Sequence, residues 1–352
     1  MDIVLFKQVF DPLFARHLAS KHDVYLHTTD NPIVIQTLQH IDMVAAGGKR
    51  FRPYLIWSMY QNEHPEAQIH EILDLLIAIE LFHVFCLVHD DIMDKALLRH
   101  GTQTIHSFAT DLLQKAGRRG NLIDVGNSQA ILAGDILFNW VFAEMQKDSW
   151  GTPESRKAVR DIFTTLVDEV CIGQMLDIDL CTETETTYDR IMQKNKLKTA
   201  RYSFARPLHI GALIGGRDDL IPFVLSFGEH IGNLFQMQDD MLDIIGDSKD
   251  TKKGSCSDVI AGQHTVLTQY ITEKNNPVHI EKLKNFFGKE TSDSLQKEVR
   301  VLFEESGALT YGNALISQYF TDIYEMIRTA QLEEKDASLF TYITSLLDHR
   351  TS

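Results

Sequence analysis

Apolar residues recur at helical spacing along most of this chain, and no other feature limits its fold as strongly. Hydrophobic positions follow one another at intervals of three and four residues, which puts them on one face of an α-helix. Runs in which apolar and polar residues alternate, as in a half-buried strand, are scarce. The sequence therefore predicts an all-α fold. The expected helices lie at residues 3–20, 30–45, 52–61, 66–95, 104–116, 125–147, 154–182, 186–194, 198–215 and 219–246, with three or four more from residue 264 to the end.

Length and composition favour one large domain. A chain of 352 residues is long enough for two or three domains. However, only 8 prolines are present, and no stretch rich in Ser, Gly or Pro has the length of a linker. The hydrophobic share of 44% is enough to bury a large core. We therefore expect a single domain that spans residues 1–352.

Charge and local composition exclude several classes of protein. The formal net charge of -15 argues against nucleic-acid binding, which needs a basic surface. The N-terminus lacks the basic start and apolar run of a signal peptide, and the longest apolar run, residues 72–88, is interrupted by Asp74, Glu80 and His83. The four cysteines have no zinc-binding spacing, so we expect reduced, buried thiols. These features predict a cytoplasmic protein without a stable membrane anchor.

One acidic pattern occurs twice, far apart in the chain. Residues 90–94 read Asp-Asp-Ile-Met-Asp and residues 239–243 read Asp-Asp-Met-Leu-Asp, each after an apolar run of helical spacing. Because residues three or four positions apart share a helix face, each copy gathers three carboxylates on about one turn. Mg²⁺ suits such oxygen ligands, since it uses one or two carboxylates and keeps waters and substrate phosphates. Two such faces opposed across a cavity would hold a diphosphate through several metal ions. The alternative is that these aspartates merely crowd at solvated helix ends.

Cationic residues flank both acidic patterns. The glycines at 47–48 end one expected helix, and Lys49 and Arg52 stand at the start of the next. A helix start with such cations favours anions. Arg99 follows the first acidic pattern, and the lysine-containing segment 246–262 follows the second. This arrangement fits a diphosphate, with metal ions on one side of its oxygens and cationic side chains on the other.

In order and spacing, these motifs resemble those of the all-trans polyprenyl diphosphate synthases. The resemblance covers residues 47–265. It implies an isoprenoid-synthase fold, a single bundle of about ten or more helices around a central cavity, and association into a homodimer. The residues that carry it are 47–53 (Gly-Gly-Lys-Arg-Phe-Arg-Pro), 80–83 (Glu-Leu-Phe-His), 89–94 (His-Asp-Asp-Ile-Met-Asp), 98–101 (Leu-Arg-His-Gly), 173–177 (Gly-Gln-Met-Leu-Asp), 198–200 (Lys-Thr-Ala) and 235–236 (Phe-Gln) before the second acidic pattern.

The resemblance implies a role for each matching residue. About three Mg²⁺ ions are implied, bound by carboxylates that contact them directly or through water. Isopentenyl diphosphate and an allylic diphosphate are the implied substrates. The implied direct metal ligands are Asp90, Asp94 and Asp239, with Asp91, Asp240 and Asp243 binding directly or through water. The implied allylic-diphosphate residues are the cations Arg99, Lys198 and Lys253, together with Thr199 and Gln236. The implied isopentenyl-diphosphate residues are Lys49, Arg52 and His83.

The resemblance also implies a reaction. The allylic C–O bond ionises while Mg²⁺ and the cationic side chains stabilise the charge that grows on the leaving diphosphate. The isopentenyl double bond then attacks the allylic cation. The released diphosphate takes the proton that is lost in the last step, so no side-chain base is required.

Two residues depart from the family pattern. His100 stands where a second arginine is usual, and Gln263 stands where a lysine is common. Histidine has a reference pKa near 6.5, so near neutrality a full charge and a bidentate donor are lost at residue 100. We expect weaker isopentenyl binding there. On the allylic side, one cation fewer lowers the affinity unless His264 or Lys252 compensates.

Product length is implied by the residues before the first acidic pattern. In the family, bulk at the positions four and five residues before the first aspartate sets the floor of the elongation pocket. These positions hold Cys86 and Phe85 here, about 6–8 Å from Asp90 along the helix axis. One aromatic residue beside a small one resembles synthases of the twenty-carbon product, geranylgeranyl diphosphate, with farnesyl diphosphate next. Phe82 is a candidate second floor.

Three other functions compete with this one. A terpene cyclase shares the fold and the metal-assisted ionisation but keeps one aspartate pattern, whereas two are intact here. A non-catalytic partner subunit of a synthase tends to lose motif aspartates, and none is lost. Glu80 and His83 match the Glu-x-x-His of di-iron bundles, which requires a second copy that this chain lacks. For His83, an ordinary core histidine is the alternative.

Overall fold

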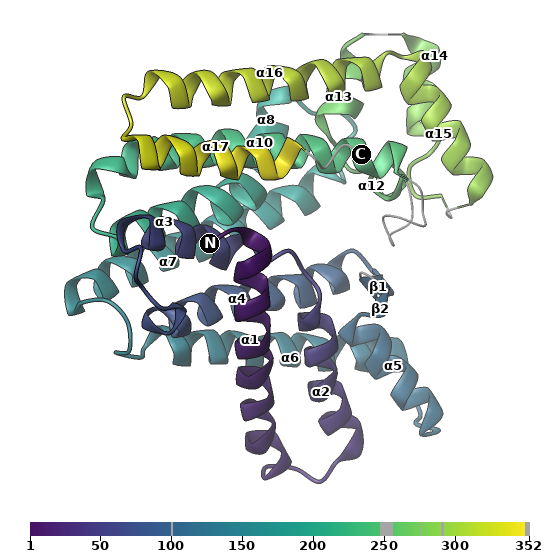
Figure 1. Cartoon of the computed structure of the whole chain (residues 1–352). Helices are drawn as coiled ribbons and strands as arrows, with labels where there is room; N and C mark the ends of the chain where they lie inside the picture. The colour runs from purple at the N-terminus through teal and green to yellow at the C-terminus, as the bar shows by residue number, and fades with distance from the viewer. Residues whose placement is uncertain (100, 247–255, 275, 290–291, 349–352) are drawn as a thin grey trace. The chain divides into compact units, whose positions relative to one another are not determined.

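The computed structural model describes residues 1–99, 101–246, 256–274, 276–289 and 292–348, and these residues are mostly helical (Figure 1). The two strands described there, β1 (Leu98–Arg99) and β2 (Thr102–Gln103), form one short antiparallel hairpin. The prediction of an all-α fold is confirmed. The chain divides into two compact units, Met1–Trp57 with Glu66–Arg156 and Ser58–Pro65 with Lys157–Ser352. That both units act as one domain stays a prediction.

The first unit is built around α4, which is buried on nearly all sides. Its apolar side chains from Leu75 to Val84, and Val88, have little contact with solvent, as expected of a helix that is apolar over most of its surface. Each fully buried aliphatic or aromatic side chain contributes about 1.5–3 kcal/mol. Helix α6 packs along α4, and α5 packs along α6. The elements are α1 (Ile3–Leu26), α2 (Pro32–Ala46), α3 (Phe51–Glu63, whose residues from Ser58 belong to the second unit), η1 (Ile69–Glu71), α4 (Leu73–Met93), β1, β2, α5 (Ile105–Lys115) and α6 (Leu122–Met145).

The second unit is built around α10. Its apolar face, from Val224 to Ile244, is buried, and it packs against η2, α16 and α9. The segment η2 is a π-helix, in which Arg206 donates its amide to the carbonyl of Arg201, five residues back. The elements are α7 (Pro153–Leu180), α8 (Tyr188–Asn195), η2 (Lys196–Ala205), α9 (Arg206–Ile214), η3 (Asp218–Leu220), α10 (Ile221–Ile245), α12 (Ser257–Ile260), α13 (Val266–Glu273), α14 (Pro277–Lys284), α15 (Asp293–Glu305), α16 (Ala308–Thr329) and α17 (Glu334–Asp348).

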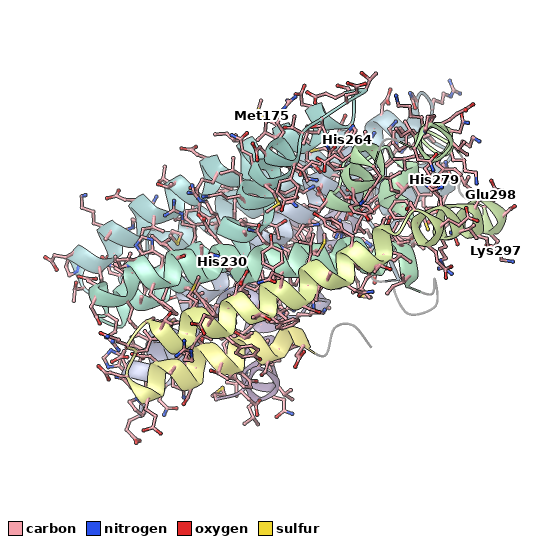
Figure 2. The ribbon with its side chains drawn as sticks, turned by 90° about the horizontal axis from the view of Figure 1, so that it is seen from above. Met175, His230, His264, His279, Lys297 and Glu298 are labelled. Carbon is pink, nitrogen blue, oxygen red and sulfur yellow. The ribbon has the colours of Figure 1, made fainter. Side chains whose placement is uncertain are left out.

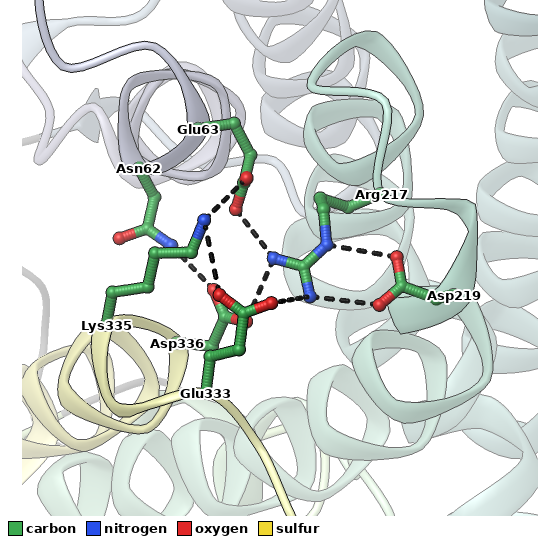
Figure 3. Close-up of polar contacts among 7 residues, drawn as sticks. All are labelled: Asn62, Glu63, Arg217, Asp219, Glu333, Lys335 and Asp336. Atoms are coloured by element: carbon green, nitrogen blue, oxygen red, sulfur yellow. Dashed lines mark hydrogen bonds and ion pairs between the residues drawn. The ribbon is translucent and has the colours of Figure 1, made fainter.

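An ion-pair cluster fixes the start of α17 in the second unit (Figure 3). Arg217 lies at its centre and contacts Glu63 at 2.7 Å, Asp219 at 2.9 Å and Asp336 at 2.9 Å. Lys335 adds an ion pair to Glu63 at 2.7 Å. Because Asp336 is fully buried, this cluster provides the charge partner that a buried carboxylate needs. The other end of α17 is held where Leu347 accepts a hydrogen bond from the Gln238 amide at 2.9 Å.

Some expected helix boundaries and one expected count are wrong. The helix expected at residues 66–95 begins only at Leu73, because Gln68 and Glu71 form a capping box that closes the separate turn η1 first. After residue 264 the described part of the chain contains five helices, α13 to α17, instead of three or four. Pro277 starts α14, and Gly307, with a φ of 80°, separates α15 from α16.

The expectation of buried thiols holds for only part of the set. All four cysteines are free, and Cys256 is buried. Cys171 is exposed, because it lies on the outer face of α7 beside the exposed residues Ile172 and Met175. Within the described residues, we find no helix whose length and hydropathy would let it cross a membrane.

Candidate active site

The first acidic pattern lies at the C-terminal end of α4. The helix ends at Met93 because Lys95 adopts a left-handed conformation, with a φ of 54°, and the amide of Ala96 donates to the carbonyl of Asp91 at 2.9 Å. This ending leaves Asp90 half-buried, Asp91 buried and Asp94 exposed. The three carboxylates therefore share one turn, as the sequence predicted.

Arg99 returns to these carboxylates through the β1–β2 hairpin. Its Nε donates to Oδ1 of Asp91 at 2.7 Å, and its Nη2 donates to Oδ2 of Asp90 at 3.3 Å. The guanidinium is 9% exposed, so these charge-assisted hydrogen bonds form in a largely desolvated setting. Arg99 thus offsets part of the repulsion within the pattern and leaves a positive charge beside it.

Of the basic residues that follow α2, one is buried in ion pairs and another is exposed to solvent. Gly48 has a φ of 116°, which suits glycine, and Lys49 is exposed. Arg50 is buried, and it donates to Oδ1 of Asp11 at 2.7 Å and to Oε1 of Glu80 at 2.5 Å. Glu80 is therefore committed to an ion pair, which removes it from the di-iron interpretation. Arg52, in α3, and His83, in α4, are half-buried.

Aromatic side chains before the first acidic pattern pack toward α6. The ring of Phe85 lies 5.6 Å from that of Phe82, 5.1 Å from that of Phe138 and 4.7 Å from that of His89. Phe85 thus faces α6, whereas Cys86 lies one turn from Asp90 on the same helix face. Of the two residues that the family links to product length, only Cys86 shares the face of Asp90.

The second acidic pattern lies in the last turns of α10. Asp240 is buried, and its Oδ1 accepts a hydrogen bond from the Gln236 amide at 2.8 Å. Oε1 of Gln236 accepts in turn from the Thr199 hydroxyl at 2.7 Å. At Gly232 a Cβ atom would lie 2.3 Å from the Cα atom of Ala200, so only glycine lets α10 approach η2 this closely. Thr199 and Gln236, predicted to line one pocket, therefore do lie together.

Asp243 is tied to the start of α12. Its Oδ1 accepts from the amide and the hydroxyl of Ser257 at 3.0 and 2.8 Å, and its Oδ2 accepts from the amide of Asp258 at 3.1 Å. Burial raises the pKa of Asp243 to about 7, and the charge of Asp258 adds to this effect. Burial also raises the pKa of Asp240 to about 7. A nearby cation would favour the ionised form of both carboxyls.

Asp177 of α7 binds two lysines, one on each carboxylate oxygen. Oδ2 lies 2.5 Å from Nζ of Lys198, and Oδ1 lies 3.2 Å from Nζ of Lys194. Burial acts to raise the pKa of Asp177, but the two lysines outweigh it and hold that pKa below its usual value. The contact is possible because Gly173 has no side chain: a Cβ atom there would lie 2.4 Å from the amide nitrogen of Lys198. The sequence analysis assigned no role to Asp177 and did not identify Lys194 as its partner.

The donor set fits a hard divalent cation. Among the residues described, no three His, Cys, Asp or Glu side chains converge as a ready-made metal cage. Mg²⁺ does not need one, because water and substrate phosphates complete its coordination shell. Buried carboxyls with raised pKa values, such as Asp240 and Asp243, are suited to a cation. His100, Lys252 and Lys253 lie outside the described residues.

The structure does not support compensation by His264 for Gln263, which stands where the family commonly has a lysine. Gln263 is half-buried and donates its backbone amide to the carbonyl of Asp258 at 2.8 Å. The ring of His264, labelled in Figure 2, has its Nε2 3.1 Å from the carbonyl of Glu183. This imidazole is thus engaged with backbone and does not take the place of the usual lysine.

Comparison with known proteins agrees with the fold and the motifs. The polyprenyl synthetase family profile matches residues 33–305. A geranylgeranyl diphosphate synthase of Methanosarcina mazei is 31% identical over 283 residues, which cover 80% of this chain and 79% of that protein. A geranylfarnesyl diphosphate synthase of Natronomonas pharaonis is 27% identical over 287 residues and covers 78% of each chain. The crystal structure of geranylgeranyl pyrophosphate synthase from Corynebacterium glutamicum, in complex with isoprenyl diphosphate and magnesium, has a TM-score of 0.87 at 28% identity and covers 97% of this chain and 98% of its own.

Fold and motifs together define an all-α enzyme of the isoprenoid-synthase type, a prenyltransferase. More specifically, the chain belongs to the polyprenyl synthetase family.

Proposed function

We propose that this protein condenses isopentenyl diphosphate with an allylic diphosphate to give a short-chain all-trans prenyl diphosphate, with geranylgeranyl diphosphate the favoured product. The observation that carries the proposal is the pair of intact acidic patterns, each at the end of a helix, in a chain of this family. Relatives named as geranylgeranyl and geranylfarnesyl diphosphate synthases support a short-chain product.

In this proposal the allylic diphosphate is bound between carboxylate-held cations and basic side chains. Mg²⁺, when bound, would stabilise the charge on the leaving diphosphate. Arg99, oriented by Asp91, would bind the same oxygens, and Lys198 and Lys253 would add two further cations. Thr199 and Gln236 would orient the substrate, and their mutual hydrogen bond supports that role. The proposed metal ligands are Asp90, Asp91, Asp94, Asp239, Asp240 and Asp243, for about three ions.

Isopentenyl diphosphate would bind at a second basic cluster without metal. Lys49, Arg52, His83 and His100 are its proposed residues. The buried ion pairs of Arg50 support this assignment, because they fix the loop that carries Lys49 and the start of α3 that carries Arg52. The released diphosphate would accept the proton lost after condensation.

We also propose that the protein works as a cytoplasmic homodimer, with its two units forming one functional domain. Resemblance to the family supports the proposal of a homodimer. Size-exclusion chromatography with light scattering gives the mass of the assembly, and a mass of a single chain would contradict this part of the proposal.

The decisive experiment is an assay of the purified chain with labelled isopentenyl diphosphate and each of dimethylallyl, geranyl and farnesyl diphosphate, with products resolved by length. We expect a prenyl diphosphate product that disappears with a chelator and returns with Mg²⁺. Asp239→Asn should lower kcat by about 10²–10³-fold, whereas the exposed Asp135→Asn on α6 should not change it. Cyclised hydrocarbon, or no turnover by folded protein, would refute the proposal.

A further inference from the structure

Lys194 is a buried cation that the proposed reaction does not use. It lies in the last turn of α8, and its side chain is 8% exposed. Its Nζ contacts Oδ1 of Asp177 at 3.2 Å and donates to the carbonyl of His264 at 3.2 Å. Lys194 therefore joins α8 to α7 and to the segment that leads into α13. A lysine is rarely buried without such partners, so these two contacts stabilise Lys194 in its buried position.

Asp177 connects Lys194 to the allylic half of the site. Each of its two oxygens binds one lysine, and its side chain is 6% exposed. Lys198 is different from Lys194, because its side chain is 28% exposed and its amine can turn toward solvent. Of the two lysines, Lys198 is the one proposed to bind the allylic diphosphate.

Binding therefore poses an electrostatic problem at Asp177. When Lys198 turns to a diphosphate, its ion pair with Asp177 weakens. A buried carboxylate that loses its only partner is strongly destabilised. With Lys194 on the other oxygen, Asp177 keeps one partner throughout. The amine of Lys198 is then held less tightly and can be shared with an anionic ligand.

We propose that Lys194 is a positioning residue for diphosphate binding: it serves as the permanent counter-ion of Asp177 and so allows Lys198 to leave that carboxylate for the ligand. This inference rests on the proposed function, specifically on the role of Lys198. It predicts that Lys194 controls affinity for the diphosphate group through Asp177, without touching the ligand itself.

Three variants and one control test the inference. In Lys194→Met, Asp177 has only Lys198 as partner and should hold it, so the affinity for diphosphate falls. In Asp177→Asn, Lys198 loses its ion pair with Asp177, and the affinity is kept. The double variant removes both buried charges, which folded proteins tolerate better than one unpaired charge, and it should recover the affinity. The matched control is Lys196→Met, because Lys196 forms a half-exposed ion pair with Glu229 at 2.8 Å.

The measurement is calorimetric titration of each full-length variant with inorganic pyrophosphate and Mg²⁺, alongside the thermal midpoint and the KM for each prenyl substrate. We expect the Kd of Lys194→Met for pyrophosphate to be at least about ten-fold higher than that of the wild type, which corresponds to about 1.4 kcal/mol. Binding by the double variant should return to within about three-fold of the wild type. The KM for the allylic substrate should rise with little change for isopentenyl diphosphate. Lys194→Arg, which keeps the charge, should stay near the wild type.

Failure of the inference is distinguishable from failure of the proposed function. If Lys194→Met lowers the thermal midpoint but binds pyrophosphate like the wild type, Lys194 is only structural and the inference is overturned. The same follows if the double variant stays weak, because Lys194 would then act through Asp240, whose pKa it lowers against the larger effect of burial. It also follows if the wild type does not bind pyrophosphate. If binding depends on Lys194 as expected but the wild type makes no prenyl diphosphate, the inference stands and the proposed function fails. Should Lys194→Met not fold, Lys194→Gln, which also removes the charge, takes its place, and wild-type binding of pyrophosphate by that folded variant would overturn the inference.

Discussion

Among the basic residues at 49–52, Arg50 is buried, whereas Lys49 is exposed and Arg52 is half-buried. Arg50 has a φ of 56°, in the left-handed region, and this turns its side chain inward to Asp11 and Glu80. The sequence predicted a basic helix start, but not which arginine is buried. That choice depends on long-range partners from α1 and α4, which no local pattern contains.

Replacing Arg50 should destabilise the first unit strongly. Arg50→Met leaves the buried Glu80 without its 2.5 Å partner, and loss of one member of a buried ion pair costs about 3–5 kcal/mol. Urea unfolding followed by circular dichroism measures this change in the free energy of unfolding. Arg328→Met removes an exposed ion pair on α16 and serves as the control, with no change expected. A loss for Arg50→Met no larger than that of the control would contradict the assignment.

Cys86 offers a test of product length. Cys86→Phe adds bulk about 6 Å from Asp90 along the axis, on the same helix face, so we expect the main product to shorten from twenty to fifteen carbons. Overpacking should cost about 1–3 kcal/mol of stability at most. Product chromatography after incubation with labelled isopentenyl diphosphate gives the answer. Cys171→Phe makes the same change at an exposed position and should leave product length unaltered; an unaltered product from Cys86→Phe would exclude this floor.

At the level of elements, helices were predictable but their junctions were less so. The apolar spacing predicted α6, α7 and α10 within a few residues and the C-terminal end of α4, because each buries a broad face. It did not predict the π-helical geometry of η2, in which Ala200 lies close to Gly232 of α10. The aspartates proposed to bind metal were recognisable from local spacing. Lys194 was not, because its partners Asp177 and His264 lie in other elements.

The ion-pair cluster around Arg217 should control how firmly α17 is attached. In Arg217→Met, the buried Asp336 loses its 2.9 Å partner, and we expect a loss of about 3 kcal/mol in the free energy of unfolding. Hydrogen exchange by mass spectrometry should show faster exchange in α17 (Glu334–Asp348) than in the wild type. Unchanged exchange there would mean that the apolar contacts, such as Phe340 against Phe227 at 4.9 Å, hold α17 by themselves.

At the scale of the whole molecule, the fold class and the family were predictable, whereas the charge partners inside each unit were not. The family was predictable because the two acidic patterns and several further motifs occur in a fixed order and spacing that can be read from the sequence. Ion pairs such as Arg217 with Glu63 join residues far apart in the chain, and sequence spacing says nothing about them. Structure is needed to separate the lysines and arginines that support the fold from those that face a ligand.

Mild acidification should reduce the stability that buried histidines contribute. Burial lowers the pKa of His106 from 6.5, and burial likewise lowers that of His40 despite its hydrogen bond to the carbonyl of Gln103. Because these folded-state pKa values lie below the unfolded value, the unfolded chain binds more protons as pH falls through 6.5. The histidine contribution is therefore complete above that value and declines below it, by at most about 1.4 kcal/mol per pH unit for each histidine. The raised pKa values of Asp240 and Asp243 act in the opposite direction over the same range.

Urea unfolding between pH 8 and 5.5 measures this slope. Because Asp240 and Asp243 also titrate near pH 7, the histidine effect is read as the difference between the wild type and His106→Gln at each pH. His106→Gln should reduce the decline, since its imidazole can no longer take up a proton. A slope that is the same in this variant and in the wild type would exclude His106 as a contributor.

The π-helix η2 sets a limit on how this protein can change in length. A π-helix holds one more residue per turn of hydrogen bonding than an α-helix of the same extent. Deleting one residue between 200 and 205 would let the segment relax to an α-helix and would rotate Lys198 and Thr199 by about 100° relative to α9. Such a deletion would turn Lys198 and Thr199, which are proposed to bind substrate, away from Asp177 and Gln236. Among descendants of this sequence, we therefore expect η2 to accept substitutions far more readily than changes in length.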